Sequence, residues 1–288
     1  MPRSARDVTP AVLRDWPLPA PGTSKHQRGR VLIVGGAART PGAVQLSGLA
    51  ALRVGAGHLT LAVARSAAVP LAVVTPEAAV IGLAENDRGS VLGGEVAPIA
   101  DDLAGTDVVV VGPGLDDAPQ AAELVRRVIP LLGQQARLVL DAFALSELPE
   151  IGPDLDPVRD RLLLTPNGTE AEILLGRRAG QPEDDVAELA DRFGAVVSSR
   201  NVIGDPGGSL WRVGTGHSGL ATSGSGDVMA GALAGLLARG ADSAQAACWA
   251  AYLHAAAGDR LAARVGRLGF LAREILDELP AVLVEVSS

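Results

Sequence analysis

The residues best suited to chemistry stand in one short run near the C-terminus. Residues 219–231 read Gly-Leu-Ala-Thr-Ser-Gly-Ser-Gly-Asp-Val-Met-Ala-Gly, and the small-residue apolar pattern that continues to Ala238 predicts a buried helix. Amide groups at the start of a helix have no partner within it and lie at the positive end of its dipole, where they favour a phosphate. The sequence therefore predicts a phosphate-binding loop whose amides come from Gly224, Ser225 and Gly226.

Asp227 is the carboxylate in the first turn of that helix. An acid beside an anion site repels its ligand unless it takes part in the reaction. Removing a proton from an attacking hydroxyl is the role that fits phosphoryl transfer. The alternative is structural: the charge of Asp227 stabilises the positive end of the helix, and the glycines only form a turn. The motif favours the general-base role and leaves the structural one open.

Composition narrows the class of protein. The chain has 288 residues, a net charge of −8 and a hydrophobic content of 48% with only 2% aromatic residues, so its core is built from Ala, Val and Leu. The acidic balance argues against a nucleic-acid partner. The single cysteine, Cys248, lies in an apolar helical pattern and predicts a buried thiol in a reducing compartment. No stretch resembles a signal peptide or a membrane span, so we expect a cytoplasmic protein without a membrane partner.

The order of elements predicts an α/β fold. After residue 29, apolar β-branched runs alternate with helical patterns, which is typical of a mostly parallel sheet with helices on both faces. No internal repeat or low-complexity linker interrupts this order, so we expect a single domain over residues 29–288. Residues 1–28 predict an extended N-terminal arm with a short helix around Ala11–Asp15.

The last third of the chain predicts a hairpin and three helices. Ala195–Val197 and Ser209–Val213 are expected to form a strand and its partner, joined as a β-hairpin through the turn at residues 205–208. Helices are then expected over Asp227–Arg239, Ser243–Val265 and Gly269–Glu278.

Small or polar residues follow the expected strands where each one ends. In open α/β sheets, ligands bind beyond the carboxyl ends of the strands, so these residues predict one shared site with the phosphate loop. They are Gly35-Gly36, Gly112-Pro113-Gly114, Asp141 and Thr165-Pro166-Asn167 with Glu170.

Each of these groups also has a purely structural interpretation. The Gly112–Gly114 bend admits a planar ligand close to the backbone, or is a plain turn. Asp141 reaches a ligand, or caps the helix that begins at the next residue. Asn167 and Glu170 have the spacing of a capping box, so Glu170 as a magnesium or water ligand is the less direct interpretation. The four histidines show no metal-ligand spacing, and no metal site held by protein side chains is expected.

The position of the phosphate loop excludes two common nucleotide folds. A dinucleotide fingerprint needs Gly-x-Gly-x-x-Gly after the first strand, and a P-loop needs Gly-x-x-x-x-Gly-Lys-Ser/Thr; neither is present. A C-terminal Gly-Ser-Gly-Asp that opens a helix is used instead by ribokinase-like small-molecule kinases.

From about Gly29 to Leu279 the chain resembles the ADP-dependent NAD(P)H-hydrate dehydratase family, the stand-alone carbohydrate-kinase-like branch of the ribokinase superfamily. The resemblance implies a ribokinase-like three-layer sandwich. The combination of motifs is specific to the family, whereas Gly-Ser-Gly-Asp alone would fit any ribokinase relative. The motifs are Arg30–Gly36, Pro41-Gly42-Ala43, Ala50–Gly57, Gly112–Leu115, Ala221–Gly231, Tyr252-Leu253-His254 and Ala257-Gly258-Asp259.

The resemblance implies a lyase that repairs nicotinamide cofactors. In the family, a nucleotide (ADP or ATP) phosphorylates the hydroxyl of NADHX or NADPHX, and loss of phosphate restores NADH or NADPH. Asp227 would deprotonate the hydroxyl, the Gly224–Gly226 amides would stabilise the phosphoryl group, and Mg²⁺ would neutralise phosphate charge. The dinucleotide site would be lined by Ala43, Gly114, Asn167 and Asp227. The nucleotide would lie beside Gly226 and the segment Ser199, Arg200 and Asn201. Relatives commonly assemble, which implies a homo-oligomer.

Three departures from the family pattern fall on the expected ligand sites. A histidine of the family is Asn167 here, and the second acid of Asp-Ala-Asp-Ala-Leu is Phe143. The Lys-Gly-Ala-x-Thr segment of the family is replaced by the shorter Ser198–Asn201, so that Ser199 stands where a phosphate-binding lysine would be and Arg200 supplies the charge nearby. Two other functions therefore stay open: a kinase for another hydroxylated small molecule, and a nucleotide-binding protein without catalysis.

Overall fold

A computed structural model describes residues 4–288 and contains one ten-stranded sheet. The strand order is β1-β10-β9-β8-β7-β6-β5-β2-β3-β4. Among the described strands, β9 alone runs against the others, and the rest of the sheet is parallel. The strands are β1 (Arg6–Val8), β2 (Arg30–Val34), β3 (His58–Ala64), β4 (Ala79–Leu83), β5 (Val108–Val111), β6 (Arg137–Leu140), β7 (Leu162–Leu164), β8 (Val196–Ser199), β9 (Val202–Gly204) and β10 (Leu210–Val213).

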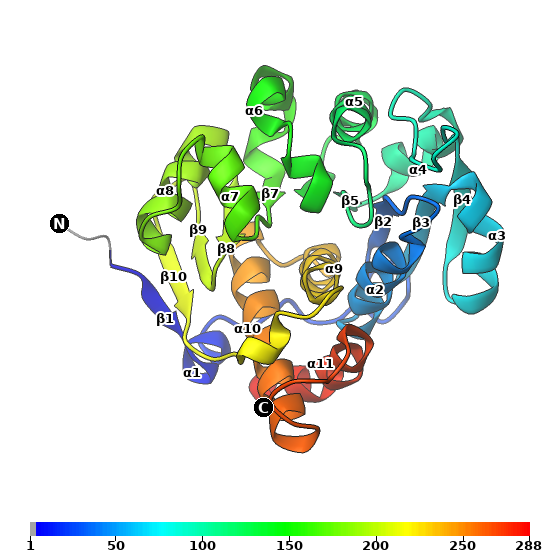
Figure 1. The fold of residues 1–288 in the computed structure, drawn as a ribbon. Coiled ribbons are helices and arrows are strands. Elements are labelled where there is room, and N and C mark those ends of the chain that lie inside the picture. The colour runs from blue at the N-terminus through cyan, green and yellow to red at the C-terminus, as the bar shows by residue number, and fades with distance from the viewer. Residues whose placement is uncertain (1–3) are drawn as a thin grey trace.

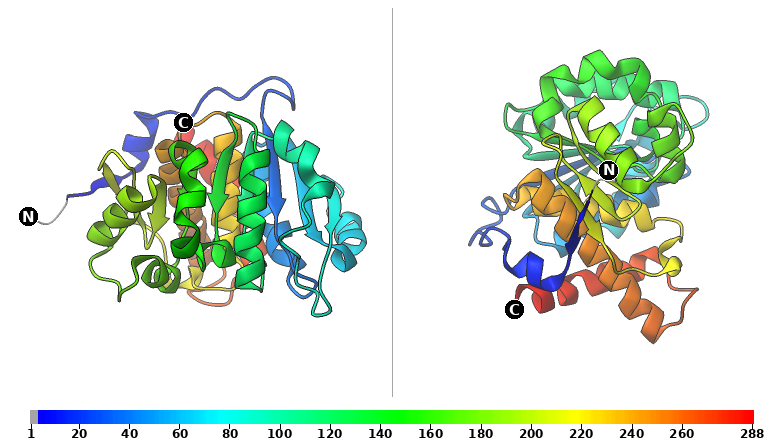
Figure 2. Two further views of the ribbon diagram at one scale, coloured as in Figure 1. Left: turned by 90° about the horizontal axis from the view of Figure 1, so that it is seen from above. Right: turned by 90° about the vertical axis from the view of Figure 1, so that its left-hand side faces the viewer.

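Helices cover both faces of the sheet, which gives the three layers visible from the side in the right-hand view of Figure 2. One layer holds α4 to α8 and the other holds α2, α9, α10 and α11 (Figure 1). The α-helices are α1 (Pro10–Arg14), α2 (Pro41–Arg53), α3 (Arg65–Val74), α4 (Ala100–Gly105), α5 (Ala118–Val128), α6 (Leu148–Ile151), α7 (Gly168–Leu175), α8 (Pro182–Phe193), α9 (Ser225–Ala238), α10 (Ser243–Arg264) and α11 (Ala272–Ser287). Short 3₁₀ turns are η1 (Ala97–Ile99), η2 (Ile129–Leu131), η3 (Ala142–Leu145), η4 (Gly152–Arg161) and η5 (Ser218–Leu220).

Alternation along the central strands divides the core between the two faces. In β5, Val108 and Val110 pack with α2, α9 and α10, while Val109 and Val111 pack with α5 and η3. Strands that are buried on both faces must be apolar at every position, because successive side chains point to opposite sides. This is why the sequence shows continuous apolar runs here, and why the carboxyl edge of the sheet is the place where polar groups can gather.

The segment before residue 29 joins the sheet. Strand β1 pairs in parallel with β10 at one edge, and Trp16 stacks on Trp211 with ring centroids 5.8 Å apart. The Trp16 carbonyl accepts hydrogen bonds from Trp249 Nε1 at 3.0 Å and Gln245 Nε2 at 3.1 Å. The short helix expected near Ala11 is α1. The boundary at residue 28 stays a prediction, and residues 1–3 of the expected arm lie outside the described part of the chain.

The predicted fold class is confirmed, and two local predictions are wrong. The predicted hairpin lacked strand β9, which lies between β8 and β10 and pairs with both. The turn at residues 205–208 joins β9 to β10, and a turn at Arg200 and Asn201 joins β8 to β9. The signal was only three apolar residues long, which is weak for a strand. The last helix begins later and ends much later than Gly269–Glu278, because α11 runs over Ala272–Ser287 with Pro280 inside it.

Candidate active site

The loops after β2 and β5 are tied together at the carboxyl edge of the sheet. Gly36 N–H donates to the Pro113 carbonyl at 2.8 Å, and the Thr40 hydroxyl donates to the Gly114 carbonyl at 2.7 Å. A Cβ atom on Gly114 would lie 3.0 Å from the Cβ of Ala43. Gly114 lies in the loop after β5 and Ala43 lies in the first turn of α2, so these two predicted substrate residues are brought into contact.

The predicted phosphate loop forms the start of α9. Gly224 is its N-cap, with φ of +87°, and a Cβ atom there would stand 2.6 Å from Leu46 Cδ1. Glycine is favoured at this position because residues with a side chain rarely adopt this backbone angle, and Leu46 of α2 would have to shift to admit a Cβ atom. Gly226 is exposed, and a Cβ atom on it would meet nothing within 4 Å. The loop thus has a fixed end at Gly224 and an open end at Gly226.

Ser225 is locked in place beside Gly224. Its side chain is buried, and its hydroxyl lies 2.8 Å from His254 Nε2 of α10. Burial lowers the pKa of His254 to about 4, so the imidazole is neutral at physiological pH. Sequence reasoning gave His254 no role at the site. The signal that pointed to it was its place in the Tyr252-Leu253-His254 motif.

Asp227 has the electrostatics of a base rather than of a helix cap. Burial, followed by the charge of Glu170, raises its pKa to about 6. A carboxylate whose main role was to stabilise a helix N-terminus would have a lowered pKa, because the dipole favours the ionised form. The N-cap position of α9 is taken by Gly224, which has no side chain with which to cap the first turn. A group with a pKa near 6 is ionised at pH 7 and still accepts a proton readily.

Asp141 lies near Asp227 at the end of β6. Its side chain is only 6% exposed, and its Oδ1 accepts a hydrogen bond from Thr165 Oγ1 at 2.7 Å. Burial raises the pKa of Asp141 to about 7. The hydrogen bond from Thr165 lowers this pKa, and the charges of Asp227 and Glu170 raise it further. No side-chain bond caps η3, so the capping interpretation of Asp141 is wrong. The three acids repel one another, which fits a place where a cation or a proton is handled.

Asn167 forms the capping box that its spacing predicts. Its Oδ1 accepts from the N–H groups of Thr169 at 2.9 Å and Glu170 at 3.0 Å, and the Asn167 N–H donates to Glu170 Oε2 at 2.8 Å. Burial raises the pKa of Glu170 above its usual value. The bonds occupy Oδ1 of Asn167, so its amide NH₂ is the group left to meet a ligand.

The predicted nucleotide segment is a tight two-residue turn between β8 and β9. Arg200 and Asn201 have φ of 48° and 64°, and Ser199 pairs with Val202. The Arg200 guanidinium donates to Asp185 and to the Gly180 carbonyl, both near the start of α8. The Ser199 side chain is 4% exposed, and its hydroxyl has no hydrogen-bond partner among the described residues.

The acidic side chains of the site determine whether a magnesium ion fits there. Within residues 4–288 no group of three or more His, Cys, Asp or Glu side chains is arranged to hold a metal ion. Burial is the main cause of the raised pKa values of Asp141 and Asp227, but the charges of Asp227 and Glu170 also raise that of Asp141, and the charge of Glu170 also raises that of Asp227. A cation between ligand and protein would relieve this repulsion. The residues fit an ion that is held mainly by nucleotide phosphates and faces these carboxylates.

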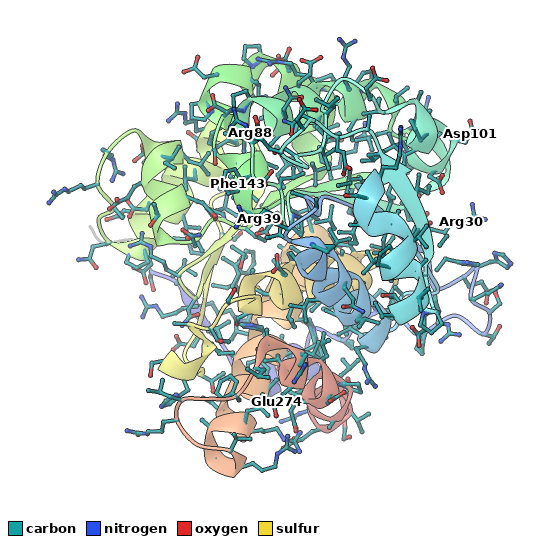
Figure 3. The ribbon with its side chains drawn as sticks, turned by 45° about the vertical axis from the view of Figure 1, so that its right-hand side comes forward. Arg30, Arg39, Arg88, Asp101, Phe143 and Glu274 are labelled. Carbon is teal, nitrogen blue, oxygen red and sulfur yellow. The ribbon has the colours of Figure 1, made fainter. Side chains whose placement is uncertain are left out.

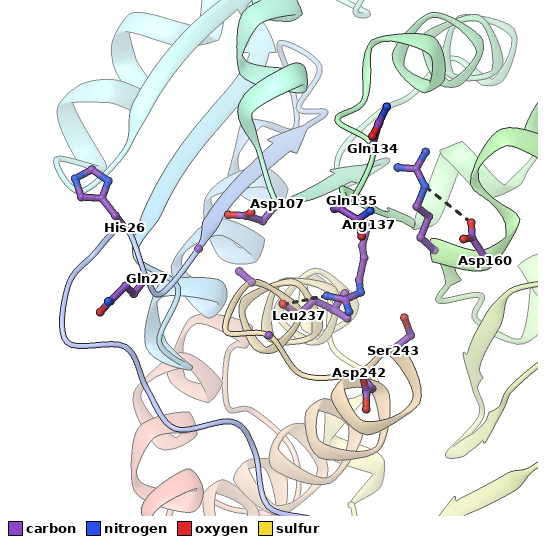
Figure 4. A pocket seen from close by; sticks show the side chains of 14 residues that line it. His26, Gln27, Asp107, Gln134, Gln135, Arg137, Asp160, Leu237, Asp242 and Ser243 are labelled. Carbon is purple, nitrogen blue, oxygen red and sulfur yellow. Dashed lines mark hydrogen bonds and ion pairs between the residues drawn. The ribbon is translucent and has the colours of Figure 1, made fainter.

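A cavity of about 560 Å³ lies at the other end of the sheet. Figure 4 shows it among Asp107, Arg137 and Asp160 at the amino ends of the strands. Leu237 of α9 and Asp242, the residue before α10, also line it. Ligands of open α/β sheets bind at the carboxyl ends. The candidate active site is therefore the opposite edge of the sheet, which holds Ala43, Gly114, Asp141, Asn167 and Asp227.

A mostly parallel ten-stranded sheet with helices on both faces, and a glycine turn that opens a late helix with a half-buried acid in its first turn, are typical of the ribokinase-like fold. A ribokinase from Thermotoga maritima shares this fold, with a TM-score of 0.55 and 13% identity over 87% of this chain and 99% of that one. The family model described as NAD(P)H-hydrate dehydratase matches residues 31–281. The chain belongs to the NAD(P)H-hydrate dehydratase family.

Individual relatives agree with the family. An ADP-dependent (S)-NAD(P)H-hydrate dehydratase from Xanthomonas campestris pv. campestris is 46% identical over 96% of both chains. The ADP/ATP-dependent NAD(P)H-hydrate dehydratase of Bacillus subtilis, co-crystallised with ATP and Mg²⁺, superposes with a TM-score of 0.81 at 25% identity over 98% of this chain and 99% of that one. The bifunctional NAD(P)H-hydrate repair enzyme Nnr of Escherichia coli is 32% identical over 94% of this chain, and the match covers 52% of the Escherichia coli protein.

No helix in residues 4–288 is long and apolar enough to cross a bilayer.

Proposed function

We propose that this protein dehydrates NADHX and NADPHX to NADH and NADPH at the expense of ADP or ATP. The proposal rests mainly on Asp227, a carboxylate with a pKa of about 6 in the first turn of α9, directly after Gly224–Gly226. A base and an anion-binding helix start at one place suit the attack of a hydroxyl on a phosphoryl group. The family membership, and the naming of the 46% identical relative for this reaction, support the choice of hydroxyl.

The reaction divides into two steps. Asp227 removes the proton from the hydroxyl on C6 of the hydrated nicotinamide ring while the oxygen attacks the terminal phosphorus of the nucleotide, and the shortened nucleotide leaves. The bond from C6 to the new phosphate ester then breaks, and the adjacent carbon loses a proton, so that phosphate departs and the ring double bond returns. The Gly224–Gly226 amides hold the phosphoryl oxygens while charge moves between them. Bound Mg²⁺ would neutralise phosphate charge opposite Asp141, Asp227 and Glu170.

The two ligands would bind on opposite sides of Asp227. The dinucleotide would lie against Ala43, Gly114, Asp227 and the free amide of Asn167, on the side of α2 and β5. The nucleotide would lie between the open Gly226 and the turn of Ser199, Arg200 and Asn201. Because the Arg200 guanidinium already bonds Asp185, we expect this turn to meet the nucleotide mainly through its backbone.

The test is a spectroscopic repair assay. Purified protein is incubated with NADHX, Mg²⁺ and either ADP or ATP, and NADH is followed by its absorbance at about 340 nm. Recovery that requires the nucleotide supports the proposal. If neither nucleotide is consumed and no NADH is recovered, the proposal is overturned. A titration of the protein with each nucleotide would then distinguish a non-catalytic nucleotide-binding protein from one that no longer binds nucleotides.

We also propose that the protein is a homo-oligomer of the cytoplasm. On α3, next to the edge strand β4, the side chains of Val69, Val73 and Val74 are 74%, 76% and 63% exposed. Such an apolar face beside a free strand edge favours burial against a second subunit. A reducing compartment is supported by Cys248, which is a buried free thiol. Light scattering that reports a monomer, both for the wild type and for Val73→Asp, would reject the assembly.

A further inference from the structure

The charge of the site and that of its proposed ligand are in conflict. Three acids, Asp141, Glu170 and Asp227, lie close enough at the site for their charges to interact, and the chain carries a net charge of −8. A dinucleotide brings at least two negative charges from its pyrophosphate. Polyanions bind acidic surfaces poorly unless local cations offset the field. The cation expected at the nucleotide turn, Arg200, is bonded to Asp185, so the compensating charge has to come from elsewhere.

Arg39 is one exposed cation at the substrate side. It lies in the loop between β2 and α2, and the described residues give its side chain neither a hydrogen bond nor an ion pair. Its neighbour Ala38 is held by the Gly89 carbonyl through a 2.9 Å bond, and its neighbour Thr40 is held by the Gly114 carbonyl at 2.7 Å. The backbone under Arg39 is therefore fixed beside Gly114, while its guanidinium is free.

Arg88 comes from a second loop that meets the first. Asn86 Oδ1 accepts from the Arg88 N–H at 3.0 Å and the Ser90 N–H at 3.1 Å, which forms a tight turn. Gly89 has φ of +82°, and a Cβ atom on it would stand 2.5 Å from the Cβ of Ala38. A glycine is thus needed for the two loops to touch. Arg88 is exposed, and its side chain has no ion pair among the described residues.

The two arginines share their side of the molecule with an exposed ring. Phe143 is 42% exposed and follows Ala142, whose φ of +50° is unusual for a residue with a side chain. Figure 3 shows Arg39, Phe143 and Arg88 in the same region of the surface, while Arg30 lies well away from them. The strained backbone turns an apolar ring outward beside two unpaired cations, which is an arrangement suited to a planar base and a phosphate.

We propose that Arg39 and Arg88 together bind a phosphate of the dinucleotide at the rim of the active site. This inference rests on the proposed function and assigns specificity to residues outside the phosphate loop. Two guanidinium groups on loops that are tied by the contact between Ala38 and Gly89 lose little freedom when they close on one phosphate. The phosphate belongs either to the pyrophosphate, which NADH and NADPH share, or to the 2′-phosphate of NADPH.

The experiment compares Arg39→Ala, Arg88→Ala and the double variant with the wild type. Dissociation constants for NADPH, NADH and ADP are measured by calorimetry, and KM values for NADPHX and NADHX by the repair assay. The matched control is Arg30→Ala, which removes the same charge at the amino end of β2 (Figure 3). Each single variant should weaken dinucleotide binding roughly tenfold and the double variant up to about 100-fold, with ADP binding and the control within twofold.

The outcomes separate the two phosphates and the two proposals. Equal losses for NADH and NADPH identify the pyrophosphate, and a loss confined to NADPH identifies the 2′-phosphate; both support the inference. Dinucleotide affinities within twofold of the wild type, or a loss of equal size for ADP, overturn it. If the wild type binds NADPH but repairs no NADHX, the proposed function fails while the binding result still decides the inference. If the wild type repairs NADHX and both variants match it, only the inference fails.

Discussion

Two turns face the proposed nucleotide, and they are built in opposite ways. At the start of α9, Gly224–Gly226 present backbone amides, and the side chains around them serve only to hold that backbone, as His254 does for Ser225. At the β8–β9 turn, the expected binding groups are side chains, and these are committed elsewhere: Arg200 to Asp185, and Ser199 to the interior. Ligand binding through a cradle of backbone amides does not depend on which side chains surround it, whereas a ligand contact made by a side chain is lost when that side chain bonds another residue.

The largest effect is expected at the base of the backbone cradle. Asp227→Asn keeps the size of the side chain but removes the group that takes the hydroxyl proton, so kcat should fall about 10²–10⁴-fold while ADP and NADPH still bind. Steady-state repair assays and calorimetry measure both quantities. In the wild type, ionised Asp227 is lost as the pH falls through about 6, so kcat/KM should drop about tenfold per pH unit below that value. A variant that retains the wild-type rate would return Asp227 to a helix-stabilising role.

The glycine turn at Gly224–Gly226 and the helix that follows it could be predicted from the sequence, because both depend on residues that are neighbours in the chain. Glycines before a small-residue apolar run, with an acid in the first turn, specify both the backbone and the charge, and the fold class followed from the alternation of apolar runs. The capping box of Asn167 and Glu170 is local in the same sense, and the structure reproduces it.

The side-chain contacts of the other turn could not be predicted. That Arg200 bonds Asp185 depends on how α8 packs against β8, which no spacing in the sequence reports. The bond between Thr165 and Asp141, and the contact between Gly89 and Ala38, join segments that are distant in the chain. Strand β9 was missed because three residues carry too little periodicity to be distinguished from a turn.

The second prediction concerns Asp141, the buried acid at the end of β6, and its effect on folding stability. The folded state holds the pKa of Asp141 near 7, well above its usual value near 4, so the folded protein binds a proton that the unfolded chain releases. Stability should therefore fall as the pH rises from about 4 to about 7, and stay reduced above it. Asp141→Asn keeps an acceptor for Thr165 and removes the buried charge, so it should raise the free energy of unfolding by about 2 kcal/mol at pH 8. Thermal melts at pH 4.5 and pH 8 measure this; a variant less stable than the wild type at pH 8 contradicts the assignment.

The third effect tests the open end of the cradle. Gly226→Ala adds a methyl group that meets no protein atom within 4 Å, so folding stability should be unchanged or slightly higher. If the nucleotide lies against Gly226, the methyl group displaces it, and KM for ADP should rise roughly tenfold, about 1.4 kcal/mol. Gly231→Ala in the same helix is the matched control: its Cβ would overlap the Ser47 carbonyl, so it should lower the melting temperature instead. Unchanged KM for ADP in Gly226→Ala would move the nucleotide away from this end.

The smallest effect on activity is expected at the β8–β9 turn. Although burial alone would raise the pKa of Asp185, hydrogen bonds from Arg177 and Arg200 lower it, so the guanidinium of Arg200 already serves a structural purpose. Arg200→Ala should cost about 1 kcal/mol of stability, because Arg177 still pairs with Asp185, and should change KM for ADP less than threefold. Chemical denaturation and nucleotide titrations of the same variant measure the two quantities. A tenfold rise in KM for ADP without loss of stability would mean that Arg200 leaves Asp185 when nucleotide binds, and the contrast between the two turns would then hold only for the free enzyme.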